Sequence, residues 1–266
     1  MSVLIVIPAR YASTRYPAKP LVPLTGADGV PKTLIRRSWE AALSVSGADR
    51  VVVATDDDRI RAEAEGFGAE VVMTSPDCAN GTERCAEALD RIGGDYEMVV
   101  NLQGDAPLTP AWFIEDLVAG LRAHPWAELA TPVLRCEGAM LASLREDRAQ
   151  GRVGGTTAVF GALNRGIYFS KEVIPFTAGT YAPHDPTPVF HHVGVYAYRP
   201  EILRAYPNWP VGPLEGLEGL EQLRFLENAR AVLCVEVEAR GRQFWELNNP
   251  SDVPKIERMM AEMGIS

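Results

Sequence analysis

Residues 3–8 of the chain read Val-Leu-Ile-Val-Ile-Pro, a short apolar run rich in β-branched side chains and closed by a proline. A continuous run without polar alternation is typical of a strand that is buried on both faces of a parallel sheet. A second run, Arg-Val-Val-Val-Ala-Thr at residues 50–55, leads into acidic residues. Further expected elements alternate with these two: strands at 69–74 and 97–102, and helices at 33–45, 58–65, 82–92 and 110–122. The alternation predicts an α/β fold with a doubly wound, mainly parallel sheet, whose ligands bind beyond the carboxyl ends of the strands.

The pattern changes at about residue 127. Short strands are expected at 130–134, 156–160, 166–169 and 193–198 without long helices between them, which predicts an antiparallel extension. A helix over 215–229, a strand over 231–237 and a helix over 250–263 follow. We therefore expect one domain over 1–266, made of a parallel half (1–126), an antiparallel part (127–230) and a closing strand and helix (231–266). The proline- and alanine-rich residues 178–188 are expected to form a mobile loop.

The composition excludes several classes of partner. The chain has 26 basic and 35 acidic side chains, a formal net charge of −9, which argues against nucleic acid or an anionic membrane as the main partner. No apolar run approaches the roughly 18 residues of a spanning helix, and the first residues lack the basic segment of a signal peptide. The four cysteines show no Cys-x-x-Cys spacing and are expected to be free thiols. These features predict a cytoplasmic protein.

The segment that follows the first strand carries an unusual local charge. It contains Arg10, Arg15 and Lys19 and no carboxylate before Asp28, although the whole chain is acidic. Neither Gly-x-Gly-x-x-Gly nor a P-loop is present. Small residues would let backbone N–H groups approach phosphate oxygens, the hydroxyls of residues 13 and 14 would donate hydrogen bonds, and the cations would neutralise a polyanion. This segment is therefore expected to bind a polyphosphate, and the alternative is a solvated loop.

Residues 7–21 closely resemble the nucleotide-binding loop of the cytidylyltransferases that activate 3-deoxy-manno-octulosonate (Kdo), the CMP-Kdo synthetases. The resemblance continues, in the order of the family, through Ala54-Thr-Asp-Asp, Asn80-Gly-Thr-Glu-Arg, Val100-Asn-Leu-Gln-Gly-Asp, His192-Val-Gly-Val-Tyr-Ala-Tyr-Arg, Asn208-Trp and Pro213-Leu-Glu-Gly-Leu-Glu-Gly-Leu-Glu-Gln-Leu-Arg. It implies a fold like that of the nucleotide-diphospho-sugar transferases. It also implies a homodimeric enzyme that transfers CMP from CTP to the anomeric hydroxyl of Kdo or a Kdo-like 2-keto-3-deoxy sugar acid. Pyrophosphate would be released, and the product would serve lipopolysaccharide or capsule synthesis.

The resemblance assigns roles to particular residues. Arg15 and Lys19 would hold the triphosphate and, with Asp105, form the catalytic set; Asp105 and Asn248 would bind Mg²⁺. The nucleotide would be bound by Ala9, Arg10, Ser13, Thr14, Arg15, Lys19, Gly81, Thr82, Arg84 and Gln103. The acceptor sugar would be bound by Lys171, His192, Tyr196, Glu221 and Gln222, within the antiparallel part that would also dimerise. The position of Asp105 at the end of an expected strand independently suits Mg²⁺, which prefers oxygen ligands, although the carboxylate could instead cap a turn.

Several of these residues have a second interpretation. Thr82 stands where a helix cap is expected, so a capping role and a ligand contact are both open. The run Asp56–Asp58 resembles the metal-binding acids of a glycosyltransferase, but it is also what a strand end followed by a helix cap would contain. Glu221 and Gln222 could lie on an exposed helix face, and the pair His191–His192 could be hydrogen-bonded scaffold.

Four positions depart from the family pattern. Ala106 replaces a glutamate near the metal, Thr157 replaces a lysine, Asn248 replaces an aspartate that binds metal, and Lys171 replaces an arginine expected on the sugar carboxylate. We therefore expect the chain to bind CTP as the family does, whereas its acceptor could be a Kdo variant or another carboxylated sugar. A metal-dependent glycosyltransferase of similar fold and a non-catalytic nucleotide-binding relative are the competing hypotheses.

Overall fold

The computed structural model describes residues 2–12, 16–153, 155–242 and 245–266. The chain forms two compact units, each built from segments that are separate in the sequence. The first unit contains Met1–Glu115, Tyr198–Arg204 and Ala239–Ser266, and the second contains Asp116–Ala197 and Ala205–Glu238. No helix of the described residues has the length and apolar character needed to cross a membrane.

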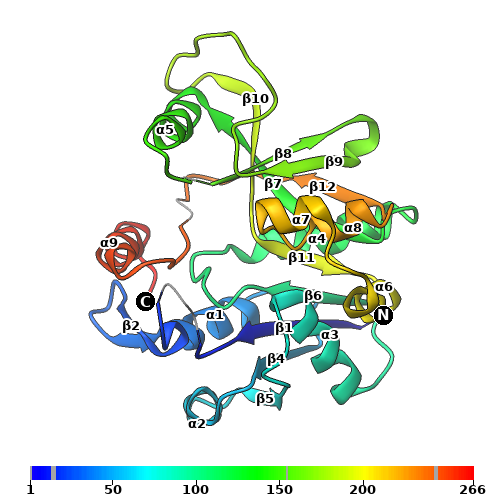
Figure 1. The fold of residues 1–266 in the computed structure, drawn as a ribbon. Helices are drawn as coiled ribbons and strands as arrows, with labels where there is room; N and C mark the ends of the chain where they lie inside the picture. Colours follow the sequence, from blue (N-terminus) through cyan, green and yellow to red (C-terminus); the bar gives the residue numbers. More distant parts are fainter. Residues whose placement is uncertain (1, 13–15, 154, 243–244) are drawn as a thin grey trace. The chain divides into compact units, whose positions relative to one another are not determined.

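A parallel sheet lies at the centre of the first unit. Its strands are β1 (Val3–Ala9), β4 (Arg50–Thr55), β5 (Glu70–Met73) and β6 (Met98–Leu102). Their order is β5-β4-β1-β6, and Figure 1 shows β1 flanked by β4 and β6. The side chains of residues 4–7 are completely buried, as expected for a strand covered on both faces. The predicted parallel sheet is confirmed.

The order of the strands creates a switch point beside β1. The helices between them are α1 (Leu34–Leu43), α2 (Asp58–Gly66) and α3 (Gly81–Ile92). The chain passes from β1 through α1 to β4 and through α2 to β5, and then returns through α3 to β6 on the other side of β1. Because such crossovers are right-handed, the reversal places α3 on the face opposite α1 and α2. The carboxyl ends of β1 and β6 therefore flank the crevice in which doubly wound sheets bind their ligands.

The first unit contains several further elements outside the parallel sheet and its helices. They are the hairpin β2 (Pro23–Thr25) and β3 (Pro31–Thr33), the start of α4 (Ala111–Ala123), α6 (Pro200–Ala205) and α9 (Val253–Met263). The 3-10 helices η1 (Lys19–Leu21) and η4 (Pro250–Asp252) belong to the same unit. Leu24 of the hairpin and Met260 of α9 share one buried apolar cluster. The hairpin was missed in the sequence, because its three-residue strands lie within a long polar, proline-rich segment.

The second unit is mainly antiparallel. Its strands are β7 (Leu129–Glu137), β8 (Thr156–Phe160), β9 (Gly166–Ser170), β10 (Pro186–His192), β11 (Val195–Tyr198) and β12 (Val232–Glu236). The order is β11-β7-β10-β8-β9, with β12 parallel to β7. β10 pairs antiparallel with β7 and β8, and β8 pairs antiparallel with β9. The predicted antiparallel extension is confirmed.

Three predictions for this unit were wrong. α5 (Gly138–Ala149) is a long helix between β7 and β8, where none was expected. β10 begins at Pro186, inside the segment 178–188 that was expected to be a loop. The helix expected over 215–229 is divided into α7 (Pro213–Glu218) and α8 (Leu223–Glu227), because Gly219 takes a left-handed conformation with φ +61° and ends α7. The 3-10 helices of this unit are η2 (Ala162–Asn164) and η3 (Tyr206–Asn208).

Candidate active site

A lysine and an aspartate meet at the switch point of the parallel sheet. Lys19 Nζ donates a hydrogen bond of 2.6 Å to Asp105 Oδ2, and the two side chains are 15% and 22% exposed. Lys19 follows β1 and Asp105 follows β6, so the fold brings together charges that are 86 residues apart in the sequence. Ala18, just before Lys19, takes a left-handed conformation with φ +58°, which is costly for a residue other than glycine by about 1–2 kcal/mol. The pair is accessible to a ligand and is held by a constrained turn.

Gly104 lets the segment that follows β6 approach the end of β1 closely. A Cβ added there would lie 2.9 Å from the carbonyl oxygen of Pro8, closer than real Cβ atoms approach backbone. Ser38 of α1 donates a hydrogen bond of 3.2 Å to the Gly104 carbonyl, and the backbone N–H of Leu247 donates one of 2.9 Å to the carbonyl of Asp105. The loop that carries Asp105 is therefore fixed on three sides.

The N-terminus of α3 lies at the same crevice. Asn80 is its N-cap and accepts a hydrogen bond of 2.9 Å from the N–H of Glu83, so Thr82 is not the cap. The Thr82 side chain is buried, and its hydroxyl lies 3.0 Å from the hydroxyl of Tyr198. A Cβ added at Gly81 would lie 3.5 Å from Pro8 Cγ and 3.7 Å from Gln103 Nε2. The first residue of α3 therefore lies beside the ends of β1 and β6.

Asn101 is a buried residue of β6 that the sequence did not single out. Neither its Oδ1 nor its Nδ2 has a hydrogen-bond partner within the described part of the chain. A Cβ added at Gly81 would lie 3.5 Å from Asn101 Nδ2, so the amide lies beside the start of α3. An unsatisfied buried amide costs about 1–3 kcal/mol, a cost that a ligand can remove by supplying the missing hydrogen bonds.

Arg84 and the acidic run after β4 are in contact with each other. The buried Arg84 guanidinium lies 3.3 Å from a carboxylate oxygen of Asp56 and donates a hydrogen bond of 2.5 Å to Thr74 Oγ1. Asp57 is the N-cap of α2. The interpretation of residues 56–58 as a strand end followed by a helix cap is confirmed.

Some of the residues that were expected to bind the nucleotide lie within the described part of the chain, and others lie outside it. Ala9 is buried at the end of β1, Arg10 is exposed, and Tyr11 lies against the guanidinium of Arg59, which is 3.3 Å from the ring centroid. Ser13, Thr14 and Arg15 lie outside the described residues.

The expected metal ligands also lie at this crevice. The Leu247 N–H bond to Asp105 places Asn248 next to the loop of Asp105. Asn248 Nδ2 lies 3.5 Å from Glu246 Oε2, a carboxylate that no sequence signal indicated. Asp252 accepts the backbone N–H groups of Asn248 and Asn249 and so shapes this turn. Among the described residues, no group of three or more His, Cys, Asp and Glu side chains is arranged to hold a metal ion.

A second cluster, in the second unit, joins three of the expected acceptor residues. The Tyr196 hydroxyl donates a hydrogen bond of 3.1 Å to Gln222 Oε1, and the Tyr196 and His192 rings are 5.7 Å apart. Gln222 is 1% exposed, so the alternative of an exposed helix face is wrong for this residue. Its Nε2 has no hydrogen-bond partner among the described residues. The cluster therefore holds a buried donor that a polar ligand could satisfy.

The hydrogen bonds of Thr131 fix the tautomer of His192. The Thr131 hydroxyl has one hydrogen and lies 2.9 Å from the carbonyl of Val195, which can only accept. His192 Nε2 lies 2.8 Å from the same hydroxyl and must therefore donate to it. His192 Nδ1 is left as an acceptor, suited to a hydroxyl of a sugar.

Lys171 is held by a glutamate that sequence reasoning missed. Glu218 accepts the backbone N–H of Lys171 at 2.9 Å and the hydroxyl of Ser170 at 2.5 Å. The Lys171 Nζ lies 3.2 Å from where a Cβ of Gly219 would stand, so the ammonium lies over the end of α7. Thr157 is buried and donates a hydrogen bond of 2.6 Å to the carbonyl of Glu172, so its hydroxyl supports the same strand end. The sequence signal for Glu218 was the three-residue spacing of the glutamates at 215, 218 and 221.

Two adjacent histidines, His191 and His192, are expected to make the stability of the folded protein depend on pH. Burial lowers the pKa of His191 to about 4, and burial with the neighbouring His191 lowers the pKa of His192 to about 3. The folded protein keeps both rings neutral, whereas the unfolded chain takes up protons below pH 6.5. Stability is therefore complete above pH 6.5 and is lost as the pH falls from there towards the folded pKa values. We expect the free energy of unfolding to fall by about 1–2 kcal/mol per histidine between pH 7 and pH 5.

Urea unfolding at several pH values measures this slope. His184 is exposed, and a His184→Gln variant should keep the slope, whereas His192→Gln should reduce it. A free energy of unfolding that stays constant between pH 7 and pH 5 would contradict the neutral state of both rings.

Comparison with known proteins agrees with this geometry. Residues 4–232 match the family model described as cytidylyltransferase. A 3-deoxy-manno-octulosonate cytidylyltransferase of Maricaulis maris (strain MCS10) is 44% identical over 264 residues, which are 99% of each chain. An 8-amino-3,8-dideoxy-manno-octulosonate cytidylyltransferase of Shewanella baltica (strain OS195) is 39% identical over 262 residues, 98% of this chain and 99% of that protein. The solved structure of CMP:2-keto-3-deoxy-manno-octonic acid synthetase complexed with CTP superposes with a TM-score of 0.83 and 31% identity, covering 99% of this chain and 100% of that chain.

The parallel sheet, its switch point and the charged pair that follows β1 and β6 are those of a nucleotidyltransferase. Its nucleotide loop does not use the P-loop or Gly-x-Gly-x-x-Gly motifs. The chain belongs to the cytidylyltransferase family, and within it to the 3-deoxy-manno-octulosonate cytidylyltransferases. The glycosyltransferase and non-catalytic hypotheses are set aside.

Proposed function

We propose that this enzyme transfers CMP from CTP to the anomeric hydroxyl of Kdo or a closely related sugar acid and releases pyrophosphate. The observation that carries the proposal is the Lys19–Asp105 pair at the switch point of a cytidylyltransferase sheet. The names of the two relatives and of the solved structure support the substrates. The product would be an activated sugar for lipopolysaccharide or capsule synthesis.

The residues at the crevice fit a nucleoside triphosphate. Lys19 would exchange its contact with Asp105 for phosphate oxygens. The N-terminus of α3 points partial positive charge at the same crevice, where negative groups are stabilised. The unsatisfied amide of Asn101 offers both a donor and an acceptor beside Gly81. Arg10 and Arg15, which follow β1 in the sequence, would add positive charge.

The donor set at this crevice also fits Mg²⁺. Asp105 and the side-chain oxygen of Asn248 are hard oxygen ligands, and Mg²⁺ commonly completes its shell with substrate phosphates and waters. Asp105 and Asn248 would hold the ion. When bound, it would neutralise phosphate charge and favour ionisation of a coordinated hydroxyl.

The cluster in the second unit fits a hydroxylated sugar acid. His192 Nδ1 would accept a hydrogen bond from a sugar hydroxyl, and Gln222 Nε2 would donate one. Lys171 would pair with the sugar carboxylate as a point charge, since it lacks the two-pronged geometry of an arginine. Glu221 and Tyr196 would provide further polar contacts.

The reaction needs no covalent enzyme intermediate. The anomeric oxygen of the sugar acid forms a bond to the α-phosphorus, the bond from that phosphorus to the bridging oxygen breaks, and pyrophosphate leaves. The protein contributes by positioning both substrates and by neutralising charge with Lys19, as in other transfers at phosphorus.

Pyrophosphate release tests the proposal. The purified enzyme, CTP and Mg²⁺ should release pyrophosphate when Kdo or its 8-amino analogue is added, and the faster of the two identifies the preferred acceptor. UTP in place of CTP should support a much lower rate. Absence of release with both sugar acids would overturn the proposal.

A Gln222→Leu variant tests the acceptor cluster. The variant keeps the size of the side chain but removes the buried donor, so the KM for the sugar acid should rise by about tenfold or more while the KM for CTP stays within about twofold. Gln150→Leu, on the exposed end of α5, is the matched control and should change neither constant. A rise in the KM for CTP alone would contradict the assignment.

We also propose that the enzyme is a homodimer that acts in the cytoplasm, where nucleoside triphosphates are made. The second unit exposes large apolar side chains, among them Leu163 (74%), Ile167 (61%) and Leu217 (84%). Apolar exposure of this kind is commonly covered by a partner. Light scattering should give twice the mass of the chain, and a monomer at micromolar concentration would contradict the dimer.

A further inference from the structure

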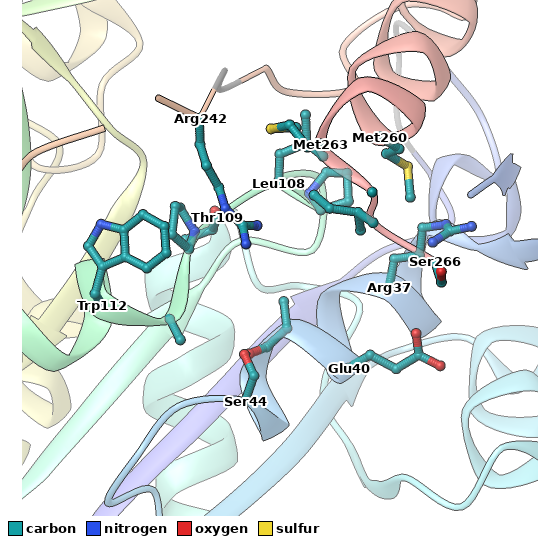
Figure 2. Close-up of a pocket in the computed structure, with 16 residues that line it drawn as sticks. Arg37, Glu40, Ser44, Leu108, Thr109, Trp112, Arg242, Met260, Met263 and Ser266 are labelled. Carbon is teal, nitrogen blue, oxygen red and sulfur yellow. The ribbon is translucent and has the colours of Figure 1, made fainter. Parts of the chain in front are cut away.

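A cavity of about 370 Å³ lies in the first unit, and neither Lys19 nor Asp105 lines it. Its volume is in the range of pockets that bind small molecules. Figure 2 shows the residues that line it, which come from α1, from the segment before α4 and its first turn, and from the end of α9 and the residues after it, together with Arg242. None of the residues assigned above to CTP or to the sugar acid is among them.

One side of the cavity is built to receive an anion. The side chain of Thr109 lines it and is 4% exposed, and its Oγ1 has no hydrogen-bond partner among the described residues. Thr109 and Pro110 lead directly into α4, a helix of 13 residues whose first turn holds no acidic side chain. The N-terminus of a helix attracts negative charge, and the Thr109 hydroxyl adds a donor at the same point.

Positive charge reaches the same side of the cavity. Arg242 lines the cavity, and its guanidinium lies 5.3 Å from the ring centroid of Trp112, which lines it too. Figure 2 shows the Arg242 side chain extending toward the side that Thr109 and Trp112 form. The acidic Glu40 also lines the cavity, but its carboxylate is paired with Lys32 at 2.9 Å and Arg36 at 3.0 Å. The charge of Glu40 is therefore balanced by two neighbouring cations.

The rest of the lining combines apolar side chains with the polar residues Arg37, Ser44 and Ser266. Leu108, Met260 and Met263 lie across from the polar side, and the Trp112 ring adds an aromatic surface. Methionine side chains adapt their shape and make favourable contacts with aromatic groups. The lining therefore suits a molecule with one anionic end and one small apolar or aromatic body.

The cavity is continuous with the loop that holds Asp105. Residues 107–109 line the cavity and connect Asp105 to α4, and the N–H of Thr109 donates a hydrogen bond of 3.2 Å to the carbonyl of Ala106. On the other side, Ser38 fixes the carbonyl of Gly104. A molecule that contacts Thr109 would bias the position of the Asp105 loop.

We propose that this cavity is a second ligand site, which binds a small organic anion with an apolar or aromatic body and regulates the enzyme through the Asp105 loop. The binding part stands independently of the enzyme's activity, and the regulatory part rests on the proposed transfer reaction.

Benzoate is the probe, and acetate is the matched anion without the apolar body. Titration calorimetry of the full chain should show saturable benzoate binding and at least about tenfold weaker acetate binding. Thr109→Val, which removes only the hydroxyl, and Arg242→Gln should each weaken benzoate binding at least about fivefold. Thr109→Ser keeps the donor and should stay within about twofold. Arg240→Gln removes a guanidinium 4.9 Å from Trp112 that does not line the cavity, and it should also stay within about twofold.

Two results would overturn the binding site: no saturable benzoate binding by the unaltered protein, or unchanged affinity in both Thr109→Val and Arg242→Gln. Thermal unfolding of each variant confirms that it is folded.

Saturating benzoate should change the rate of pyrophosphate release at least about twofold in the unaltered enzyme but not in Arg242→Gln. An equal rate with and without benzoate in the unaltered enzyme would overturn the regulation. Absence of transfer activity with intact benzoate binding would overturn the proposed function and leave the binding site standing.

Discussion

Replacing Asp105 by asparagine is expected to lower kcat by about a thousandfold. The substitution keeps the shape of the side chain but removes its charge, and with it the carboxylate that would hold the ion and that now pairs with Lys19. Ala106 and Asn248 stand where the resembled family has acidic residues, so two carboxylates of the family pattern are already absent. Steady-state release of pyrophosphate measures the effect.

An aspartate outside the crevice provides the control for this change. Asp90 lies at the exposed end of α3 and pairs with Arg204 at 3.0 Å. Asp90→Asn makes the same chemical change in the same unit and should keep kcat within about twofold, since exposed ion pairs contribute little. A kcat within tenfold of the original in Asp105→Asn would remove Asp105 from the catalytic set.

Replacing Lys19 by methionine is expected to weaken CTP binding at least tenfold and to lower kcat/KM by about a hundredfold or more. The ammonium would neutralise phosphate charge both in the bound substrate and as pyrophosphate leaves, so binding and turnover should both suffer. Removal of the lysine also leaves Asp105 without its 2.6 Å partner. Lys19→Arg should retain part of the activity, because it keeps the charge but not the compact geometry of an ammonium.

A second lysine separates this effect from a general loss of charge. Lys171→Met removes the same charge from the cluster of the second unit and should raise the KM for the sugar acid without changing the affinity for CTP. If both lysine variants weakened CTP binding equally, the division of roles between the two clusters would be wrong.

Much of the first unit follows from local sequence patterns. The run at residues 3–7 is a fully buried strand, and Asp57 caps α2 where a polar strand end and helix start were expected. The meeting of Lys19 and Asp105 also follows from the sequence, because the loops after neighbouring parallel strands share one edge of the sheet. These features depend on periodicity and topology, which a single sequence records.

Other features depend on contacts that no local pattern records. The division of the helix expected over 215–229 comes from the backbone of Gly219, and glycine within a helical pattern is often tolerated. Asn80 rather than Thr82 caps α3, since helix boundaries are uncertain by a few residues. Glu218 was missed because its partner Ser170 is brought to it by the fold, whereas Glu246 lies two residues from Asn248 in a segment without a recognised motif.

The structure shows what surrounds the residues that depart from the family pattern. Thr157 is buried and hydrogen-bonded to a backbone carbonyl, and Ala106 is buried in the turn before α4. Lys171 is fixed through its backbone by Glu218. Three of the four departures therefore lie in well-packed or hydrogen-bonded positions, which is consistent with an adapted site.

Titration of the protein with CTP in the presence of Mg²⁺ is the most direct measurement of the central proposal, that the loops after β1 and β6 bind a cytidine triphosphate. We predict saturable binding of one CTP per chain, at least about tenfold weaker binding by Lys19→Met, and unchanged binding by Lys171→Met. Absence of a saturable signal in the unaltered protein, or equal affinity in Lys19→Met, would contradict the account.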